Sequence, residues 1–161
     1  MILRIFFGLL IFLMFPVLNV QAQENVFQVG ISMIEKVPQN FFGTWRVKSV
    51  LLDTNSPANF KKKNLDIWNL SRSGNVINLR NPFSGAEASV TLSYAGNNEV
   101  CFTKTSNYEG KRLTDTVKIV IDGNTFSGEN RILLETLSNV DNSVLKTAEA
   151  VYSLSGEKIA E

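Results

Sequence analysis

The chain has 161 residues, and its 16 Lys and Arg nearly balance its 15 Asp and Glu. This balance argues against a nucleic-acid-binding protein, which needs an excess of basic side chains. The chain contains no His and one Cys. These counts exclude Ser-His-Asp and Cys-His catalysis, His-based zinc sites and an intramolecular disulfide. We therefore expect a protein that is not an enzyme, holds no metal or cofactor, and depends on a hydrophobic core for its stability.

The first 22 residues have the pattern of a secretory signal peptide. Arg4 is their only charge, residues 5–15 form an apolar run of eleven, and the small residue Ala22 precedes a polar segment. A run of eleven is far shorter than the ~20 apolar residues that cross a bilayer, so a membrane anchor is the weaker alternative. We expect cleavage before Gln23, a secreted or periplasmic protein, and no stable membrane insertion.

Residues 23–39 form a lead-in segment before the main domain. The run VFQVGISMI within it admits three interpretations: a ninth strand, a clasp or a partly ordered arm. Residues 31–35 are a candidate for a short helical segment. The sequence alone does not choose between these alternatives.

Residues 40–161 read as one domain of eight β-type runs, the first at residues 44–52. Turn residues separate the runs at short spacing, and three of the breaks have strong hairpin signals. These signals are Ser73-Gly74-Asn75, Ala95-Gly96-Asn97-Asn98 and Asp122-Gly123-Asn124. Many short strands joined by such turns predict an all-β sandwich or barrel. The run RILLETL (131–137) fits either a continued strand or a short helix.

Period-two alternation predicts which side chains of these strands face the core. Three sets of apolar residues each share one face: Ala88, Val90, Leu92 and Tyr94; Val117, Ile119 and Ile121; and Ala148, Ala150, Tyr152 and Leu154. In the alternating run NEVCFTKT, Cys101 is predicted to be a buried, inert thiol. The strand carboxylates Glu87, Asp115, Glu129 and Glu149 are predicted to lie on the solvated outer face. The basic run Lys61–Lys63 follows a turn-rich stretch, which favours a solvated loop over contact with an anionic surface.

The stretch NFFGTWRVKSVLLD (40–53) sets a Gly and a Trp at the head of the first strand. This element, Gly43-Thr44-Trp45, resembles the Gly-x-Trp signature of the lipocalins and the wider calycin group. The resemblance implies an eight-stranded up-and-down antiparallel β-barrel with Trp45 packed at a closed end and a cavity opening at the opposite rim. It also implies a basic side chain over the Trp, for which Lys158 is the candidate. Gly43 and Trp45 are thus expected to be structural residues.

Alternation from Trp45 then predicts the residues that face the barrel interior and contact a ligand. They are Val47, Leu51, Val90, Leu92, Phe102, Ile119 and Tyr152. This lining is mostly apolar, which suits a small hydrophobic molecule. The leading prediction is an exported β-barrel that binds or carries such a ligand. The alternative is a structural or interaction protein of the cell envelope whose barrel is filled by its own side chains; its protein partner is not indicated by the sequence.

Overall fold

The protein is an eight-stranded antiparallel barrel in a computed structural model that describes residues 32–160. Two 3₁₀ turns, η1 (Met33–Lys36) and η2 (Gln39–Phe41), precede the strands. The strands are β1 (Gly43–Thr54), β2 (Lys63–Ser73), β3 (Val76–Arg80), β4 (Glu87–Gly96), β5 (Glu99–Tyr108), β6 (Lys111–Asp122), β7 (Thr125–Leu137) and β8 (Val144–Ala160). Each strand pairs with the next in sequence, as predicted, and β8 pairs with β1 to close the ring.

The tight turns between strands have the backbone geometry that their residues allow. Gly74 and Gly123 each have φ +57°, in the left-handed region where Gly meets no steric penalty. Asn97 and Asn98 also have positive φ, and Asn tolerates this conformation better than most residues. All three predicted hairpins are confirmed. The run RILLETL belongs to β7, which resolves the choice between strand and helix.

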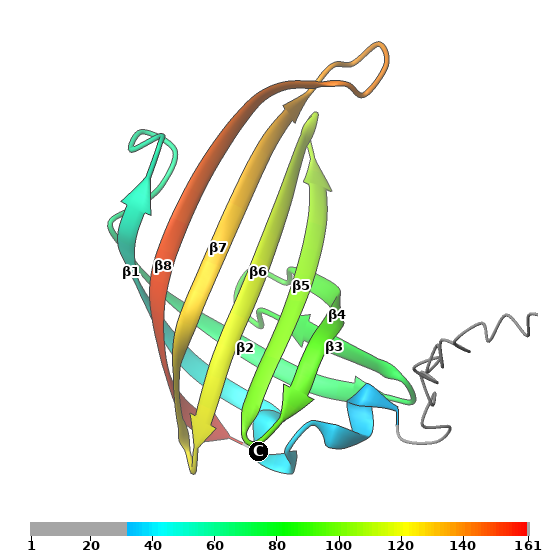
Figure 1. Ribbon diagram of the computed structural model, residues 1–161, viewed down its shortest axis with the longest axis vertical. Helices are drawn as coiled ribbons and strands as arrows, with labels where there is room; N and C mark the ends of the chain where they lie inside the picture. Colours follow the sequence, from blue (N-terminus) through cyan, green and yellow to red (C-terminus); the bar gives the residue numbers. More distant parts are fainter. Residues whose placement is uncertain (1–31, 161) are drawn as a thin grey trace, which may run out of the picture.

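The closing pair of strands is formed by the two ends of the barrel sequence. Strand β8 is 17 residues long and pairs with β7 along nearly its whole length. It also pairs with β1 from Thr44↔Ala160 to Thr54↔Ala150. In Figure 1 the long strands β5 to β8 form a continuous curved wall, while β2 to β4 cross the lower part of the molecule.

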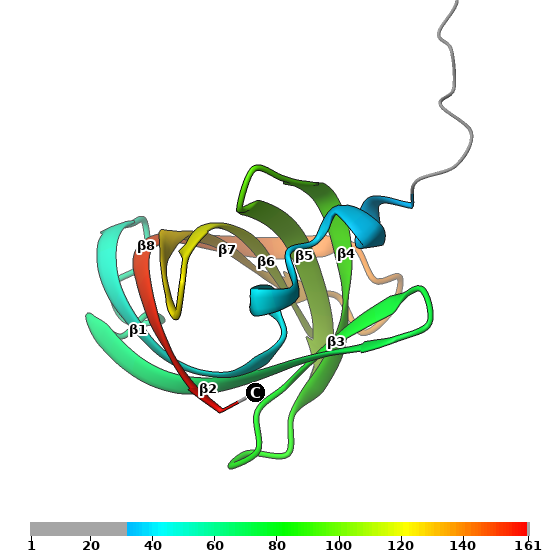
Figure 2. The same cartoon turned by 90° about the horizontal axis from the view of Figure 1, so that it is seen from below.

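Buried aromatic side chains of the core pack around Trp45 at the closed end. Trp45 and Phe41 are fully buried, and the Trp45 Nε1–H donates a hydrogen bond of 2.9 Å to the Phe41 carbonyl oxygen. The Phe126 ring packs 5.1 Å from the Trp45 ring, centroid to centroid. Figure 2 shows η2 lying across the lower opening of the ring. The η2 turn and Trp45 therefore close this end together, as the resemblance implied.

Glycines make this plug possible at two points. Gly43 has φ +120°, a backbone conformation that residues with a Cβ rarely adopt. A glycine at this position therefore allows the chain to turn from η2 into β1. A Cβ at Gly156 would lie 2.1 Å from the Phe126 ring. The ring therefore occupies the space that a side chain on β8 would fill.

Two predictions about side-chain direction in β4 and β5 are wrong. A bulge between Leu92 and Tyr94 shifts the alternation of β4, so Tyr94 is exposed and Ala95 is buried. Cys101 is only half-buried, because its neighbour Phe102 takes the inward position and leaves the thiol on the outer face. The Cys101 Sγ lies 3.7 Å from Glu99 Oε1.

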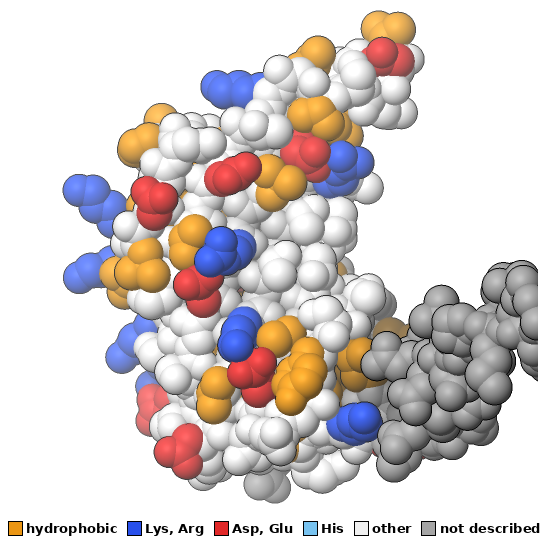
Figure 3. All heavy atoms as spheres, viewed as in Figure 1, with side chains coloured by type: hydrophobic (Ala, Val, Ile, Leu, Met, Phe, Trp, Pro, Cys, Tyr) orange, Lys and Arg blue, Asp and Glu red, His pale blue; other side chains and the backbone are white. Residues whose placement is uncertain are grey.

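The outer surface mixes charges of both signs with scattered apolar side chains, as the face in Figure 3 shows. Within residues 32–160, no helix has the length and apolar character needed to span a membrane. The predicted signal peptide (1–22) and most of the predicted lead-in segment (23–39) lie outside the described residues. Of that segment, η1 and the start of η2 are described, and the turn predicted near residues 31–35 is the 3₁₀ turn η1.

Candidate ligand-binding cavity

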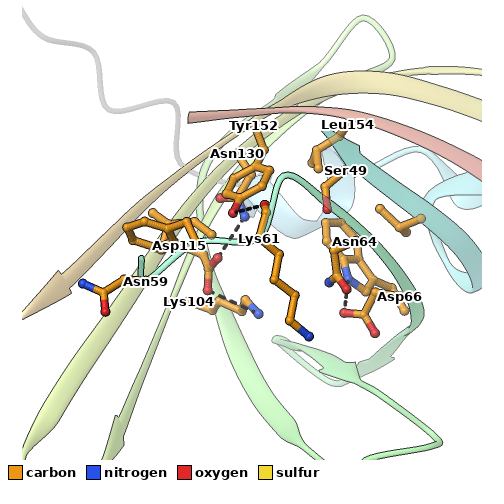
Figure 4. A pocket seen from close by; sticks show the side chains of 14 residues that line it. Ser49, Asn59, Lys61, Asn64, Asp66, Lys104, Asp115, Asn130, Tyr152 and Leu154 are labelled. Atoms are coloured by element: carbon orange, nitrogen blue, oxygen red, sulfur yellow. Dashed lines mark hydrogen bonds and ion pairs between the residues drawn. The ribbon is translucent and has the colours of Figure 1, made fainter. Parts of the chain in front are cut away.

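A cavity of about 350 Å³ lies inside the barrel (Figure 4). Fourteen residues from six strands and one loop line it. They are Val47, Ser49, Asn59, Phe60, Lys61, Asn64, Asp66, Trp68, Lys104, Asp115, Asn130, Ile132, Tyr152 and Leu154. The lining combines apolar walls with several charged and amide side chains.

Apolar side chains from four strands form part of the cavity wall. Val47, Trp68, Ile132 and Leu154 come from β1, β2, β7 and β8, each at a position in phase with the inward face of its strand. Trp68 also stacks on Phe126, with ring centroids 6.0 Å apart. The aromatic cluster of the closed end therefore extends to the base of the cavity.

A buried polar cluster stands opposite these walls. Asp115 is 5% exposed and accepts a hydrogen bond of 2.9 Å from Asn130 Nδ2 on its Oδ1. Its Oδ2 lies 3.3 Å from the ammonium nitrogen of Lys104, whose side chain is 27% exposed. Both carboxylate oxygens are thus engaged by side chains of the barrel itself. Burial of a charge requires such partners, because an unpaired buried carboxylate is costly.

The inward direction of Asp115 corrects the prediction that it lies on the solvated face. Glu87 and Glu149, of the same group, are exposed as expected, and Glu129 contacts the exposed Arg131. Asp115 has the same parity on β6 as Val117 and Ile119, which both face inward. The alternation of β6 therefore contained the signal, and the usual preference of carboxylates for solvent outweighed it in the prediction.

Asn130 is fixed in one orientation by its bond to Asp115. The side chain is 7% exposed, and its Oδ1 has no hydrogen-bond partner among residues 32–160. Turning the amide over would set its oxygen against the carboxylate, so the bond to Asp115 keeps the Nδ2 on that side. An unsatisfied buried acceptor costs about 1–3 kcal/mol, which makes this cluster expensive for stability alone.

The second carboxylate of the cavity, Asp66, is also fully engaged. Its Oδ1 accepts a bond of 2.8 Å from the Ile67 backbone N–H and a further bond from Asn81 Nδ2. Its Oδ2 accepts the Trp68 Nε1–H at 3.2 Å. These bonds hold the Trp68 ring in place at the base of the cavity.

The loop between β1 and β2 forms part of the rim. Phe60 and Lys61 of this loop line the cavity, and the Tyr152 hydroxyl donates a hydrogen bond of 3.0 Å to the Lys61 carbonyl oxygen. Burial raises the pKa of the Tyr152 hydroxyl. The basic run Lys61–Lys63 is exposed, as predicted, but the side chain of Lys61 points toward the cavity (Figure 4). No pattern in the sequence predicted the direction of this side chain.

The seven residues predicted to contact a ligand do not all meet at this cavity. Val47 and Tyr152 line it. Phe102 and Ile119 lie in the packed core, and Leu51 packs against that core without lining the cavity. Val90 and Leu92 border a separate pocket beside η1. The charged and amide side chains were not among the predicted contacts.

The described residues offer no obvious metal site. Within residues 32–160, no three Cys, Asp, Glu or His side chains are grouped in a way that could hold a metal ion. The side chains that line the cavity offer a ligand hydrogen bonds, ion pairs and apolar contacts.

The predicted basic side chain over the Trp is present: the Lys158 ammonium nitrogen lies 5.6 Å from the centroid of the Trp45 ring. The closed ring of eight antiparallel strands is consistent with a calycin-like β-barrel. No protein-family model matches the chain, and no curated protein sequence matches it. A solved structure described as EF1p2_mFAP2b bound to DFHBI is similar over 80% of this chain and 100% of its own, with 13% identity and a TM-score of 0.46.

Proposed function

We propose that this protein is an exported β-barrel that binds a small molecule with a mainly apolar body. The observation that supports this function best is the cavity itself. It is closed at one end by Trp45 and η2, and apolar side chains of four strands line it. Its volume of about 350 Å³ falls within the ~300–1,000 Å³ typical of ligand pockets.

The polar residues inside the barrel add support of a different kind. A barrel that only had to be stable would fill this region with apolar side chains, since buried charges seldom add net stability. Asp115, Asn130 and Lys104 face the interior instead. Features that cost stability in this way are expected where a site serves a function. The cavity also counts against the alternative, an interaction protein with a filled barrel.

Binding is tested with N-phenyl-1-naphthylamine, a neutral apolar dye that fluoresces strongly when it leaves water. We expect wild-type protein to bind the dye at micromolar concentration. Ser49→Phe should abolish binding, because Ser49 lines the cavity and the ring would occupy its space. Lys48→Phe is the matched control, since Lys48 is the exposed neighbour on the outer face of β1.

Two results would contradict the binding function. The first is no dye binding by the wild-type protein, and the second is equal binding by Ser49→Phe and wild type. Melting temperatures of both variants show whether each one is folded.

Export is tested separately by N-terminal sequencing of the protein recovered outside the cytoplasm. The signal pattern of residues 1–22 predicts a mature chain that begins at Gln23. Recovery of the full-length chain in a membrane fraction would contradict the proposed export.

A further inference from the structure

The carboxylates and the lysines of the cavity differ in how many of their hydrogen-bonding groups already have partners within the protein. Asp66 accepts three bonds and Asp115 contacts two side chains, so the four carboxylate oxygens all have partners. Lys104 has one ion-pair partner, Asp115, for its three N–H groups. Lys61 has no ion-pair partner among residues 32–160. Among the charged side chains of the cavity, the hydrogen-bonding capacity left is therefore that of the cationic donors Lys61 and Lys104.

The two lysines reach the cavity from different elements. Lys61 belongs to the β1–β2 loop, and Lys104 projects inward from β5. In Figure 4 the nitrogen ends of Lys61 and Lys104 lie in the same part of the view, and the apolar wall residue Leu154 lies on the other side of the cavity lining, near Ser49 and Tyr152. A single ligand with a compact charged group and an apolar body would meet both features at once.

From this arrangement we propose that the cavity selects an organic anion, with its carboxylate or sulfonate between Lys61 and Lys104 and its apolar body against Trp68, Ile132 and Leu154. This inference rests on the proposed binding function and names the chemical class of its ligand. Lys104 keeps one N–H on Asp115 and directs another to the ligand. Charge-assisted hydrogen bonds of this kind are stronger than neutral ones. Asp115 offsets part of the Lys104 charge, so the anion of the ligand competes with this carboxylate for the Lys104 ammonium group.

The test compares two dyes that share an apolar body. 8-Anilinonaphthalene-1-sulfonate carries a sulfonate, and N-phenyl-1-naphthylamine lacks it. We expect the anionic dye to bind more tightly to the wild-type protein. Lys61→Met should weaken the anionic dye roughly fivefold, the upper end for a partly exposed ion pair, and leave the neutral dye unchanged. Lys62→Met is the matched control, because Lys62 is an equally charged neighbour that does not line the cavity.

Asp115→Asn should change the affinity for the anionic dye in the direction opposite to Lys61→Met. It removes a negative charge beside Lys104 and should strengthen binding of the anionic dye, whereas a purely structural role for Asp115 predicts no selective gain. The neutral dye reports whether this variant keeps its cavity. Added salt should weaken the anionic dye alone, since screening acts on the charge interaction.

The outcomes separate the two proposals. If the neutral dye binds as tightly as the anionic one, or if Lys61→Met and Lys62→Met behave alike, the anion selectivity is wrong and the binding function stands. If neither dye binds the wild-type protein, both proposals are wrong.

Discussion

Lys158 lies over the indole ring of Trp45, with its ammonium nitrogen 5.6 Å from the ring centroid, although 113 positions separate them in sequence. The pair is set by strand register, since Trp45 and Lys158 are direct partners across the β1–β8 ladder. A cation over an aromatic face is attracted by the ring, by about 0.5–1 kcal/mol at exposed sites. The contact therefore joins the first strand to the last at the closed end of the barrel.

Trp45→Ala should destabilise the protein by about 3–5 kcal/mol, the usual range for deleting a large buried aromatic side chain. Trp45 is fully buried, and its N–H bond to Phe41 would be lost as well. Chemical denaturation measures the free energy of unfolding. Lys48→Ala, on the exposed face of the same strand, should stay within about 0.5 kcal/mol of wild type. A similarly small loss for Trp45→Ala would show that Trp45 is not the plug of the barrel.

Gly156→Ala should destabilise the protein by about 1–3 kcal/mol, the typical cost of overpacking a core. The added methyl would lie 2.1 Å from the Phe126 ring. Phe126→Leu in the same chain should recover part of this loss, because the two substitutions share one space. Ser155→Ala, at the exposed neighbouring position, is the control. Additive losses for the two core substitutions would mean that the ring and Gly156 are not in contact.

Cys101 should react slowly with iodoacetamide at neutral pH in the native protein. Burial raises the pKa of the thiol, and the negative charge of Glu99 raises it further, while Lys118 acts in the opposite direction. Less of the thiol is therefore present as the reactive thiolate. Glu99→Gln should lower the pKa and speed the labelling, whereas Glu129→Gln, on another strand, should not. Labelling as fast as that of a free cysteine would contradict the prediction.

The ion pair between Arg112 and Glu135 should make stability depend on pH in the acid range. Hydrogen bonding from Arg112, at 2.6 Å between Nε and Oε2, holds the pKa of Glu135 below its ordinary value. The unfolded chain therefore binds a proton on this carboxylate more readily than the folded protein does. The contribution of the ion pair to the free energy of unfolding is complete above the ordinary glutamate pKa of about 4.3, and it is lost as pH falls through the lowered pKa of the folded state. Glu135→Gln should flatten this part of the curve of unfolding free energy against pH. An unchanged curve would show that the pair contributes nothing.

Alternation and turn chemistry were enough to predict the barrel. Asp122-Gly123 and Ser73-Gly74 mark hairpins by local backbone preference, and Gly43 with Trp45 marks the head of the first strand. Such signals predict the fold well because each one reflects a local backbone preference, and the folded structure agrees with that preference at the same position. The β4 bulge between Leu92 and Tyr94 could not be predicted, because one extra residue does not change the composition of the strand. It nevertheless reverses which of the following side chains face the core.

The polar part of the cavity was harder to predict than the fold. The alternation of β6 indicates the inward direction of Asp115, but the partners that allow its charge to be buried, Lys104 and Asn130, come from the strands on either side. Those partners cannot be found from the sequence of β6 alone. The position of Lys61 depends on how the β1–β2 loop crosses the rim, which periodicity does not describe. Features that depend on side chains from several strands are therefore the hardest to predict from one sequence.

The pairing of β1 with β8 also has a consequence for how the chain reaches this structure. Thr44 and Ala160 are partners in the β1–β8 pairing. The barrel therefore stays open until the last strand has joined the sheet. Until then β1 and β7 are free edges able to pair with other chains, and contacts so distant in sequence form slowly. Assembly of this barrel is thus governed by its final strand, and we expect the unfinished chain to be the form most prone to aggregation.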